Sequence, residues 1–182
     1  MRGLGATRVV LGGGGVLLAA ALLALGVAMF RGVGDSPLGE SEAGFTRAAA
    51  FELPTLEGGR FALESHAGGP VFLYFWASWC APCEREAPLI QALWPEYEAR
   101  GYTFVGVNVM DNRGDAEAFA RRHALTFPQL YDGGEGVYVD YGVSGLPEAF
   151  FLLPGLEVSR KYVGELREPE FRAMLERLAE GA

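Results

Sequence analysis

The two cysteines of the chain, Cys80 and Cys83, are separated by two residues within the segment "YFWASWCAPCEREAP" (74–88). Such a pair can bind a metal, cross-link the fold or exchange electrons with another protein. A structural zinc site needs about four ligands, and the two histidines, His66 and His123, have no cysteine or histidine companion beside them. A copper-delivery pair of the Cys-x-x-x-Cys type needs one more intervening residue. The spacing therefore disfavours metal binding.

A disulfide between Cys80 and Cys83 would close a loop of only four residues. Closing so short a loop removes little conformational entropy from the unfolded chain, so this bond stabilises a fold poorly. A structural disulfide is nevertheless the default in an oxidising compartment. The spacing suits electron exchange better, because thiol–disulfide exchange needs one accessible sulfur and a second sulfur within bonding reach.

The neighbouring sequence places the two sulfurs differently. The apolar run 71–76 predicts a strand buried on both faces, and a helix is expected from Cys80 onward. At a helix start, unpaired N–H groups and the helix dipole stabilise the thiolate of Cys80 over its thiol. Cys83, one turn further in, is expected to be more buried and to act as the resolving thiol. Trp76 and Trp79 are expected to limit the access of water, Trp76 as a core residue.

The rest of the chain alternates strands and helices and ends in a hairpin and a helix, which predicts an α/β fold with a mixed sheet. Pro88 and Pro95 are expected to bend or break the helix that follows Cys80. Gly58 and Gly59 predict the turn of a small hairpin. In chain order we expect strand 71–76, helix 80–100, strand 102–110, helix 113–124, strand 127–131, a short helix or turn at 136–142, strands 149–153 and 157–164, and a helix from Pro169 to Gly181.

Residues 9–30 contain no charge over 22 residues, a length that covers about 33 Å as a helix and matches a bilayer core. Arg2 and Arg8 precede this run and Arg31 follows it, so the positive-inside bias favours a cytoplasmic N-terminus and a domain on the far side of the membrane. A cleaved signal peptide is the alternative, but the run is long for one and the only cleavage candidate, at 24–26, is poor. We expect an uncleaved anchor.

The part of the chain after Arg31 carries 12 basic and 23 acidic residues, a net charge of 12 − 23 = −11. So acidic a chain is not expected to bind nucleic acid. The stretch 32–50 is small, polar and aperiodic, which is typical of a tether. The expected organisation is a cytoplasmic tip at 1–8, a transmembrane signal-anchor at 9–30, a tether at 31–50 and a folded domain at 51–182.

The segment "FWASWCAPC" resembles the active-site segment of the thioredoxin fold, in which a helix proline follows the second cysteine by five residues, as Pro88 does here. That fold also has a loop with a cis X-Pro bond packed against the cysteines, and "GVSGLPEAFFLL" (142–153) is similar to it. The resemblance implies a cis bond between Leu146 and Pro147. It also implies a mixed central sheet flanked by helices, preceded here by an extension hairpin and one transmembrane helix.

Three features resemble the membrane-anchored TlpA/ResA/CcmG (DsbE) group of extracytoplasmic thiol-disulfide oxidoreductases, with the CcmG branch favoured. They are the anchor, the position of Glu86 in "WCAPCEREAP", and Glu148 after the cis-proline candidate, although Ala149 stands where the CcmG branch usually has threonine. The resemblance covers about residues 51–178.

This resemblance gives Glu86 a role as proton partner of the resolving thiol, and its place three residues after Cys83 puts both on one helix face. The alternative for Glu86 is an exposed helix carboxylate, and Glu84 is expected to point elsewhere. For Glu148 two roles stay open: a second acidic modulator of the cysteines, or a rim residue that contacts substrate. Tyr74 stands where thioredoxin has a buried aspartate, so proton transfer by that route is not expected.

The implied function is reduction of disulfides in selected proteins, with apocytochrome c as the leading substrate and a membrane thiol transporter of the CcdA or DsbD type as the reductant of the pair. The implied protein is a monomer of the bacterial cytoplasmic (inner) membrane, with its domain on the periplasmic side and no cofactor or metal. The expected catalytic residues are Cys80, Cys83, Glu86 and Pro147, and the expected substrate contacts are Trp79, Pro82, Gly145, Leu146 and Glu148.

The sequence leaves other functions open as alternatives. A TlpA- or ResA-type reductant could serve another substrate, such as the copper site of an oxidase, or the envelope in general. Peroxidases of this fold use the pattern P-x-x-x-T-x-x-C, which requires threonine at Ala77 and proline at Leu73. A docking protein or metallochaperone without enzymatic activity is the alternative of another class, and loss of one cysteine would favour it.

Overall fold

The computed structural model describes Gly15 and residues 18–23 and 39–180. The chain forms two units, 1–36 and 37–182. Gly15 and residues 18–23 are helical, but most of the predicted anchor lies outside the described residues. Within the described part of the chain, no helix combines the length and apolar character needed to cross a membrane. The anchor therefore stays a prediction.

A six-stranded mixed sheet forms the centre of the second unit, with the strand order β1-β8-β7-β4-β5-β6. Strand β4 pairs in parallel with β5 and antiparallel with β7, which confirms the expected mixed sheet. Two further strands form the expected hairpin around Gly58 and Gly59. The strands are β1 (Gly39–Ser41), β2 (Glu52–Pro54), β3 (Arg60–Ala62), β4 (Val71–Trp76), β5 (Thr103–Val109), β6 (Gln129–Asp132), β7 (Glu148–Leu152) and β8 (Val158–Val163).

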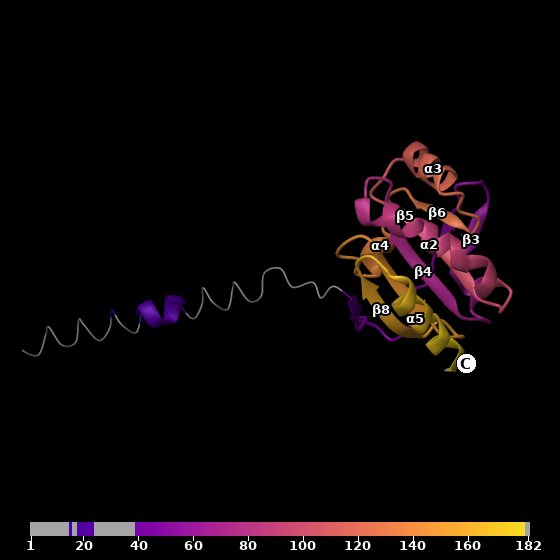
Figure 1. The fold of residues 1–182 in the computed structure, drawn as a ribbon. Coiled ribbons are helices and arrows are strands. Elements are labelled where there is room, and N and C mark those ends of the chain that lie inside the picture. The colour runs from indigo at the N-terminus through magenta and orange to yellow at the C-terminus, as the bar shows by residue number, and fades with distance from the viewer. Residues whose placement is uncertain (1–14, 16–17, 24–38, 181–182) are drawn as a thin grey trace, which may run out of the picture. The chain divides into compact units, whose positions relative to one another are not determined.

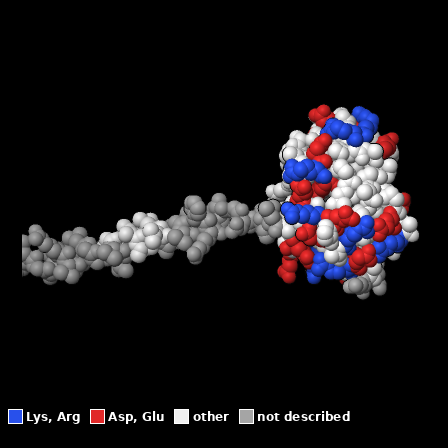
Figure 2. All heavy atoms as spheres, in the orientation of Figure 1, with Lys and Arg blue, Asp and Glu red and all other residues white. Residues whose placement is uncertain are grey.

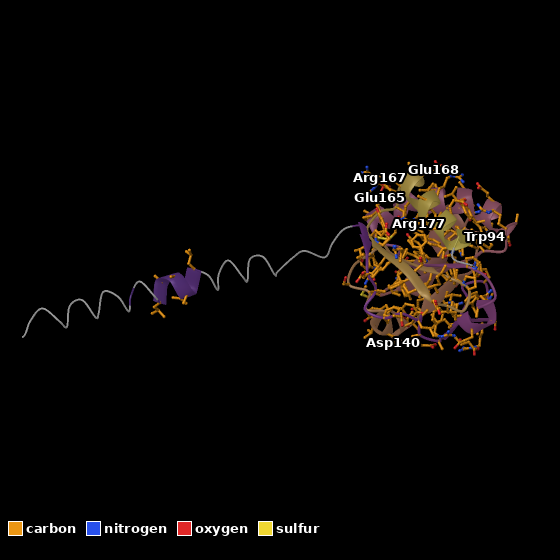
Figure 3. The ribbon with its side chains drawn as sticks, turned by 90° about the horizontal axis from the view of Figure 1, so that it is seen from below. Trp94, Asp140, Glu165, Arg167, Glu168 and Arg177 are labelled. Carbon is orange, nitrogen blue, oxygen red and sulfur yellow. A yellow bond between two sulfur atoms is a disulfide. The ribbon has the colours of Figure 1, made fainter. Side chains whose placement is uncertain are left out.

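Helices cover both faces of this sheet. The helices are η1 (Leu63–His66), α2 (Ala81–Glu98), α3 (Arg113–Arg122), α4 (Val137–Asp140) and α5 (Glu168–Glu180). The buried side chains of α2, α3 and α5 pack in one cluster with both cysteines, and we call the sheet face beneath them the cysteine face. Figure 1 shows α2 and α5 in front of β4 and β8. Val137 of α4 packs in a second cluster on the opposite face, and Figure 3 shows Asp140 across the molecule from Arg167 and Glu168.

Alternation along the strands assigns each side chain to one of these faces, because successive strand residues point in opposite directions. In β4, the side chains of Phe72, Tyr74 and Trp76 belong to the cysteine face, whereas those of Val71, Leu73 and Phe75 belong to the opposite face. All six residues are buried. The strand is therefore a continuous apolar run, as the sequence predicts.

The helix that follows Cys80 covers almost the expected range and is not interrupted. Helix α2 continues from Ala81 to Glu98 through both Pro88 and Pro95, so neither of these prolines, which were expected to bend or break it, breaks the helix. Each proline removes one backbone hydrogen bond. Ile90, Leu93 and Tyr97 are almost fully buried against the sheet, and this packing holds the helix together across those gaps.

The expected tether at 31–50 is too long at its C-terminal end. Residues 39–41 form the edge strand β1, which pairs with β8 through Gly39 and Val163. Ala48 is buried and donates its N–H to the carbonyl of Leu156 at 2.9 Å. The sequence "GES" carries no apolar pattern, because the pairing partner of this strand lies more than a hundred residues away. Residues 31–38 lie outside the described residues.

Candidate active site

Cys80 and Cys83 form a disulfide at the N-terminus of α2. Cys80 is the N-cap residue, with extended backbone angles, and its sulfur accepts a hydrogen bond from the N–H of Cys83 at 3.2 Å. Cys80 is 4% exposed and Cys83 is completely buried. After reduction, this N–H and the helix dipole favour a thiolate at Cys80. The geometry therefore fits an attacking sulfur at Cys80 and a resolving sulfur at Cys83.

Asp111 holds the turn that leads from β4 to Cys80. Its carboxylate accepts hydrogen bonds from the backbone N–H of Ser78 at 2.6 Å and from the hydroxyl of Ser78 at 2.9 Å. The indole N–H of Trp79 donates to the carbonyl of Met110 at 2.9 Å. No sequence motif singles out Asp111, although its place directly after a buried strand is a usable signal.

Trp79 lies beside the cysteines with 60% of its surface exposed. It borders a hollow of about 510 Å³ together with Met110 and Tyr138. Asp111, Asp115 and Asp132 also line the hollow, and among the described residues no lysine or arginine does. Trp79 therefore exposes an apolar surface next to an acidic recess.

Glu86 is buried three residues after Cys83 and is only 2% exposed, so the alternative of an exposed helix carboxylate is wrong. Burial raises the pKa of Glu86 to about 8, although the N–H of Leu166 donates to its Oε2 at 2.7 Å and lowers the pKa in part. A carboxyl with this pKa exchanges its proton near neutral pH.

Tyr74 faces Glu86 from β4, which the sequence analysis did not expect. Burial and the Glu86 carboxylate raise the pKa of Tyr74 well above its ordinary value. Neither Tyr74 Oη nor Glu86 Oε1 has a hydrogen-bond partner within ordinary distance. The two groups are nevertheless close enough for Tyr74 to lower the pKa of Glu86. The signal was available, because Tyr74 and Trp76 share one face of the strand.

Glu84 points away from the cysteines, as expected. Its carboxylate lies 2.8 Å from the guanidinium of Arg122 and 3.1 Å from the imidazole of His123. The hydrogen bond from Arg122 lowers the pKa of Glu84. This carboxylate therefore serves the contact between α2 and α3.

The loop before β7 carries the expected cis bond between Leu146 and Pro147. Strand β7 begins with Glu148 opposite Phe75, so the loop lies next to the end of β4 from which the cysteine turn departs. Leu146 packs against the cluster that contains both cysteines. Pro147 is buried and Gly145 is half-buried, whereas the half-buried Pro82 lies in the first turn of α2.

Glu148 lies in a different environment from the one that either expected role requires. Its side chain is completely buried, which contradicts a rim contact with substrate. It belongs to the opposite face of the sheet, because its strand neighbours Phe150 and Leu152 pack there. The sheet therefore separates Glu148 from the cysteines. The carboxylate lies 2.7 Å from the ammonium of Lys161 and accepts the N–H of Ser144 at 3.2 Å.

Most basic side chains of the described residues pair with a carboxylate. On the face drawn in Figure 2, acidic and basic residues are interspersed. Arg172 lies 2.8 Å from Glu96, and Arg100 lies 2.6 Å from Glu176. Within the described ranges, no group of three or more His, Cys, Asp or Glu side chains is arranged to hold a metal ion.

Residues 46–160 match the AhpC/TSA family. The chain is 37% identical over 126 residues to the thiol-disulfide oxidoreductase ResA of Geobacillus thermodenitrificans, which covers 69% of this chain and 72% of the relative. It is 32% identical over 130 residues to ResA of Halalkalibacterium halodurans, covering 71% and 74%.

Solved structures show the same similarity. A protein of Chlorobium tepidum described as the thiol:disulfide interchange protein DsbE superposes with a TM-score of 0.67 at 31% identity, over 77% of this chain and 96% of that chain. The MTB protein dsbF, solved in mixed oxidized and reduced forms, gives a TM-score of 0.65 at 32% identity, over 70% and 94%. StoA from Bacillus subtilis gives 0.62 at 26% identity, over 71% and 98%.

Proposed function

Because the chain belongs to the AhpC/TSA family and to its TlpA/ResA/CcmG branch of thiol-disulfide oxidoreductases, we propose that it reduces disulfides in selected proteins outside the cytoplasm, with apocytochrome c as the leading substrate. The protein is an oxidoreductase of the thioredoxin type whose redox pair is Cys80 and Cys83. The single observation that supports thiol–disulfide exchange is the Cys80–Cys83 disulfide at the N-terminus of α2, with Glu86 buried one helical turn after Cys83.

The reaction begins with the reduced pair. The Cys80 thiolate attacks one sulfur of the substrate disulfide, which forms a mixed disulfide and releases the other substrate sulfur as a thiolate. The Cys83 thiolate then attacks Cys80, which releases the second substrate sulfur and leaves the Cys80–Cys83 disulfide. Two electrons pass to the substrate in each cycle.

Glu86 accepts and returns the proton that this cycle moves. Cys83 must lose a proton before it attacks. Its thiol is completely buried, so water cannot accept that proton. Glu86 as carboxylate accepts that proton, and as carboxylic acid returns it when the pair is reduced again. Tyr74 faces the carboxyl from the strand and lowers its pKa, which keeps Glu86 within reach of neutral pH.

The proposed setting follows from the N-terminal sequence. An anchor at 9–30 would hold the protein in the bacterial cytoplasmic membrane as a monomer, with its domain on the periplasmic side. A membrane thiol transporter of the CcdA or DsbD type would return electrons to the pair. Trp79 and the loop ending in Pro147 would contact the substrate, together with Pro82, Gly145 and Leu146.

A trapping experiment tests the proposal. The Cys83→Ala variant lacks the resolving thiol, so its mixed disulfide through Cys80 should persist. We expect this variant, in membranes, to form a reducible covalent adduct with apocytochrome c. The same variant should form an adduct with a peptide that carries an oxidised Cys-x-x-Cys-His segment.

The Cys80→Ala variant is the matched control, because it keeps Cys83 but lacks the attacking sulfur. Equal adduct formation by both variants would contradict the assigned roles. Capture of another envelope protein instead of apocytochrome c would refute the leading substrate and favour a reductant of a different target. Absence of any adduct would refute the reductase function.

A further inference from the structure

Lys161 is the single lysine of the chain, which contains 14 arginines. It lies in β8 opposite Phe150 of β7, and its side chain is only 14% exposed. Its ammonium lies 2.7 Å from Oε1 of the completely buried Glu148 and 5.4 Å from the centre of the Phe150 ring. A buried ion pair therefore connects two neighbouring strands on the face away from the cysteines.

This ion pair also holds the loop that precedes β7. The ammonium of Lys161 donates to the carbonyl of Gly142 at 3.2 Å. The other carboxylate oxygen of Glu148 accepts the N–H of Ser144 at 3.2 Å. Gly142 and Ser144 are themselves exposed, so the Lys161 ammonium and the Glu148 carboxylate contact the loop from its buried side. These residues belong to the loop 142–147, which lies next to the turn that leads to Cys80.

We propose that the pair formed by Glu148 and Lys161 positions the loop 142–147 for binding of a disulfide-bearing peptide. Both are positioning residues, because neither reaches the reacting sulfurs. This inference deepens the proposed reductase function and rests on it. The role of Glu148 in the site is thus indirect, through the backbone of Gly142 and Ser144.

Stability alone does not require such a pair. Removing two charges from water is costly, and neutral side chains of similar volume often replace a buried ion pair without loss of stability. Neutral side chains would, however, lose hydrogen bonds to the loop. A methionine in place of Lys161 cannot donate to the carbonyl of Gly142, and a glutamine in place of Glu148 is a weaker acceptor for the Ser144 N–H than a carboxylate. Preformed loop geometry lowers the ordering cost of binding a peptide. The pair therefore fits a requirement for loop geometry.

The double variant Glu148→Gln/Lys161→Met tests this role, because it leaves no unpaired charge buried. Two measurements are made, each against the wild type. The first is hydrogen exchange of the loop 142–147 in the oxidised, substrate-free protein, which we expect to be about tenfold faster in the variant. The second is single-turnover reduction of a peptide with an oxidised Cys-x-x-Cys segment. We expect the half-saturating peptide concentration to rise about tenfold and the maximal rate to stay within about twofold.

The control is the double variant Glu40→Gln/Arg160→Met, which removes a surface ion pair between β8 and β1 and also the ion pair of Glu40 with Arg177 of α5. It should leave the loop exchange and the half-saturating concentration unchanged. Loop exchange that stays slow in Glu148→Gln/Lys161→Met would overturn the inference. A faster loop with an unchanged half-saturating concentration would overturn it as well. If the wild type reduces no peptide, the reductase proposal fails, and the exchange measurement alone decides the positioning role.

Discussion

Two glutamates are buried on opposite faces of the same sheet, and they differ in what surrounds them. Glu86, on the cysteine face, has one N–H donor at 2.7 Å and a second oxygen without a partner. Glu148, on the opposite face, has an ammonium at 2.7 Å and an N–H donor at 3.2 Å. Both glutamates are therefore buried, but the loss of hydration is compensated by a nearby cation only at Glu148.

This difference separates a proton exchanger from a structural anchor. Desolvation without a cation disfavours the carboxylate, so Glu86 takes up a proton near neutral pH. The Glu148 carboxylate instead lies against the ammonium of Lys161 and accepts the N–H of Ser144, so it fixes the position of the groups around it. Burial alone therefore does not determine the role of a carboxyl group, whereas the presence or absence of a nearby cation does.

Unpartnered polar atoms extend this contrast. Among the described residues, the cysteine face also buries polar atoms without hydrogen-bond partners on strands β4, β5 and β6. They are Tyr74 Oη, Trp76 Nε1, Asn108 Oδ1 and Gln129 Oε1. On the opposite face, Glu148 Oε1 makes no hydrogen bond of ordinary geometry either, but the ammonium of Lys161 lies 2.7 Å from it. Buried polar groups usually find partners, so the concentration of unpartnered atoms on the cysteine face fits a functional face more than a structural one.

The largest expected effect comes from removing the counter-charge on the opposite face. Lys161→Met leaves the Glu148 carboxylate buried without a cation, and we expect the free energy of unfolding to fall by about 3–5 kcal/mol at pH 7. Urea unfolding measures it. Arg160→Met, on the same strand but in a surface ion pair, should cost less than about 1 kcal/mol. A cost this small for Lys161→Met would remove the contrast between the two glutamates.

Glu86→Gln probes the cysteine face by the pH dependence of stability. The pKa of Glu86 is about 8 in the folded protein, against an ordinary value of 4.5. Between these values the folded state holds a proton that the unfolded state has lost, so stability falls as pH rises through this window. Each pKa unit corresponds to about 1.4 kcal/mol, so the fall is on the order of 3 kcal/mol by pH 7 and on the order of 5 kcal/mol over the whole window.

In Glu86→Gln this fall should be absent, so the variant should be more stable than the wild type at pH 8.5 and similar to it at pH 5. Urea unfolding of the oxidised protein across this range is the measurement, because the disulfide keeps the thiols from titrating. Glu84→Gln, on the surface of the same helix, should keep the fall of the wild type. Parallel curves for Glu86→Gln and wild type would show that the Glu86 carboxyl titrates as an exposed group does.

The smallest effect is expected from two tyrosines, one on each face. Tyr74→Phe removes a hydroxyl without a hydrogen-bond partner, so stability should change by less than about 1 kcal/mol. Because Tyr74 lowers the pKa of Glu86, this variant should raise that pKa above 8. Carboxyl carbon NMR titration of labelled glutamate measures the shift.

Tyr141→Phe is the counterpart on the opposite face, where the hydroxyl donates to the carbonyl of Ala49 at 2.7 Å. Its loss should cost about 1 kcal/mol and leave the titration of Glu86 unchanged. If Tyr141→Phe shifts the pKa of Glu86 as far as Tyr74→Phe does, the effect of Tyr74 on Glu86 does not depend on the face of the sheet.

The sequence was sufficient for features that depend on local pattern. The run 71–76 is uninterrupted and apolar, so the buried strand β4 could be predicted within one residue. The Cys-x-x-Cys spacing, Pro88 and the segment around Pro147 identified the fold through a family resemblance, and the cis bond at Leu146–Pro147 agrees with it. Glu86 followed from the same resemblance, with which its helical spacing to Cys83 agrees.

Features that depend on pairing between distant segments could not be predicted. Strand β1 has three residues without an apolar pattern, and only β8 defines it. The face on which Glu148 lies depends on the register of β7, because a shift by one residue would move its carboxylate to the cysteine face. Lys161 had one available signal, its uniqueness among 15 basic residues, but its partner was not readable from that.

The pairing of β1 with β8 also limits how far the active site can reach. With the predicted anchor ending at residue 30, the chain between bilayer and domain shortens from the expected residues 31–50 to residues 31–38. A fully extended chain spans at most about 3.3–3.6 Å per residue, so this connection reaches no further than about 29 Å instead of about 70 Å. If the predicted anchor exists, the connection is thus shorter by 12 residues (20 − 8), and a substrate would have to come correspondingly nearer to the membrane to be reduced.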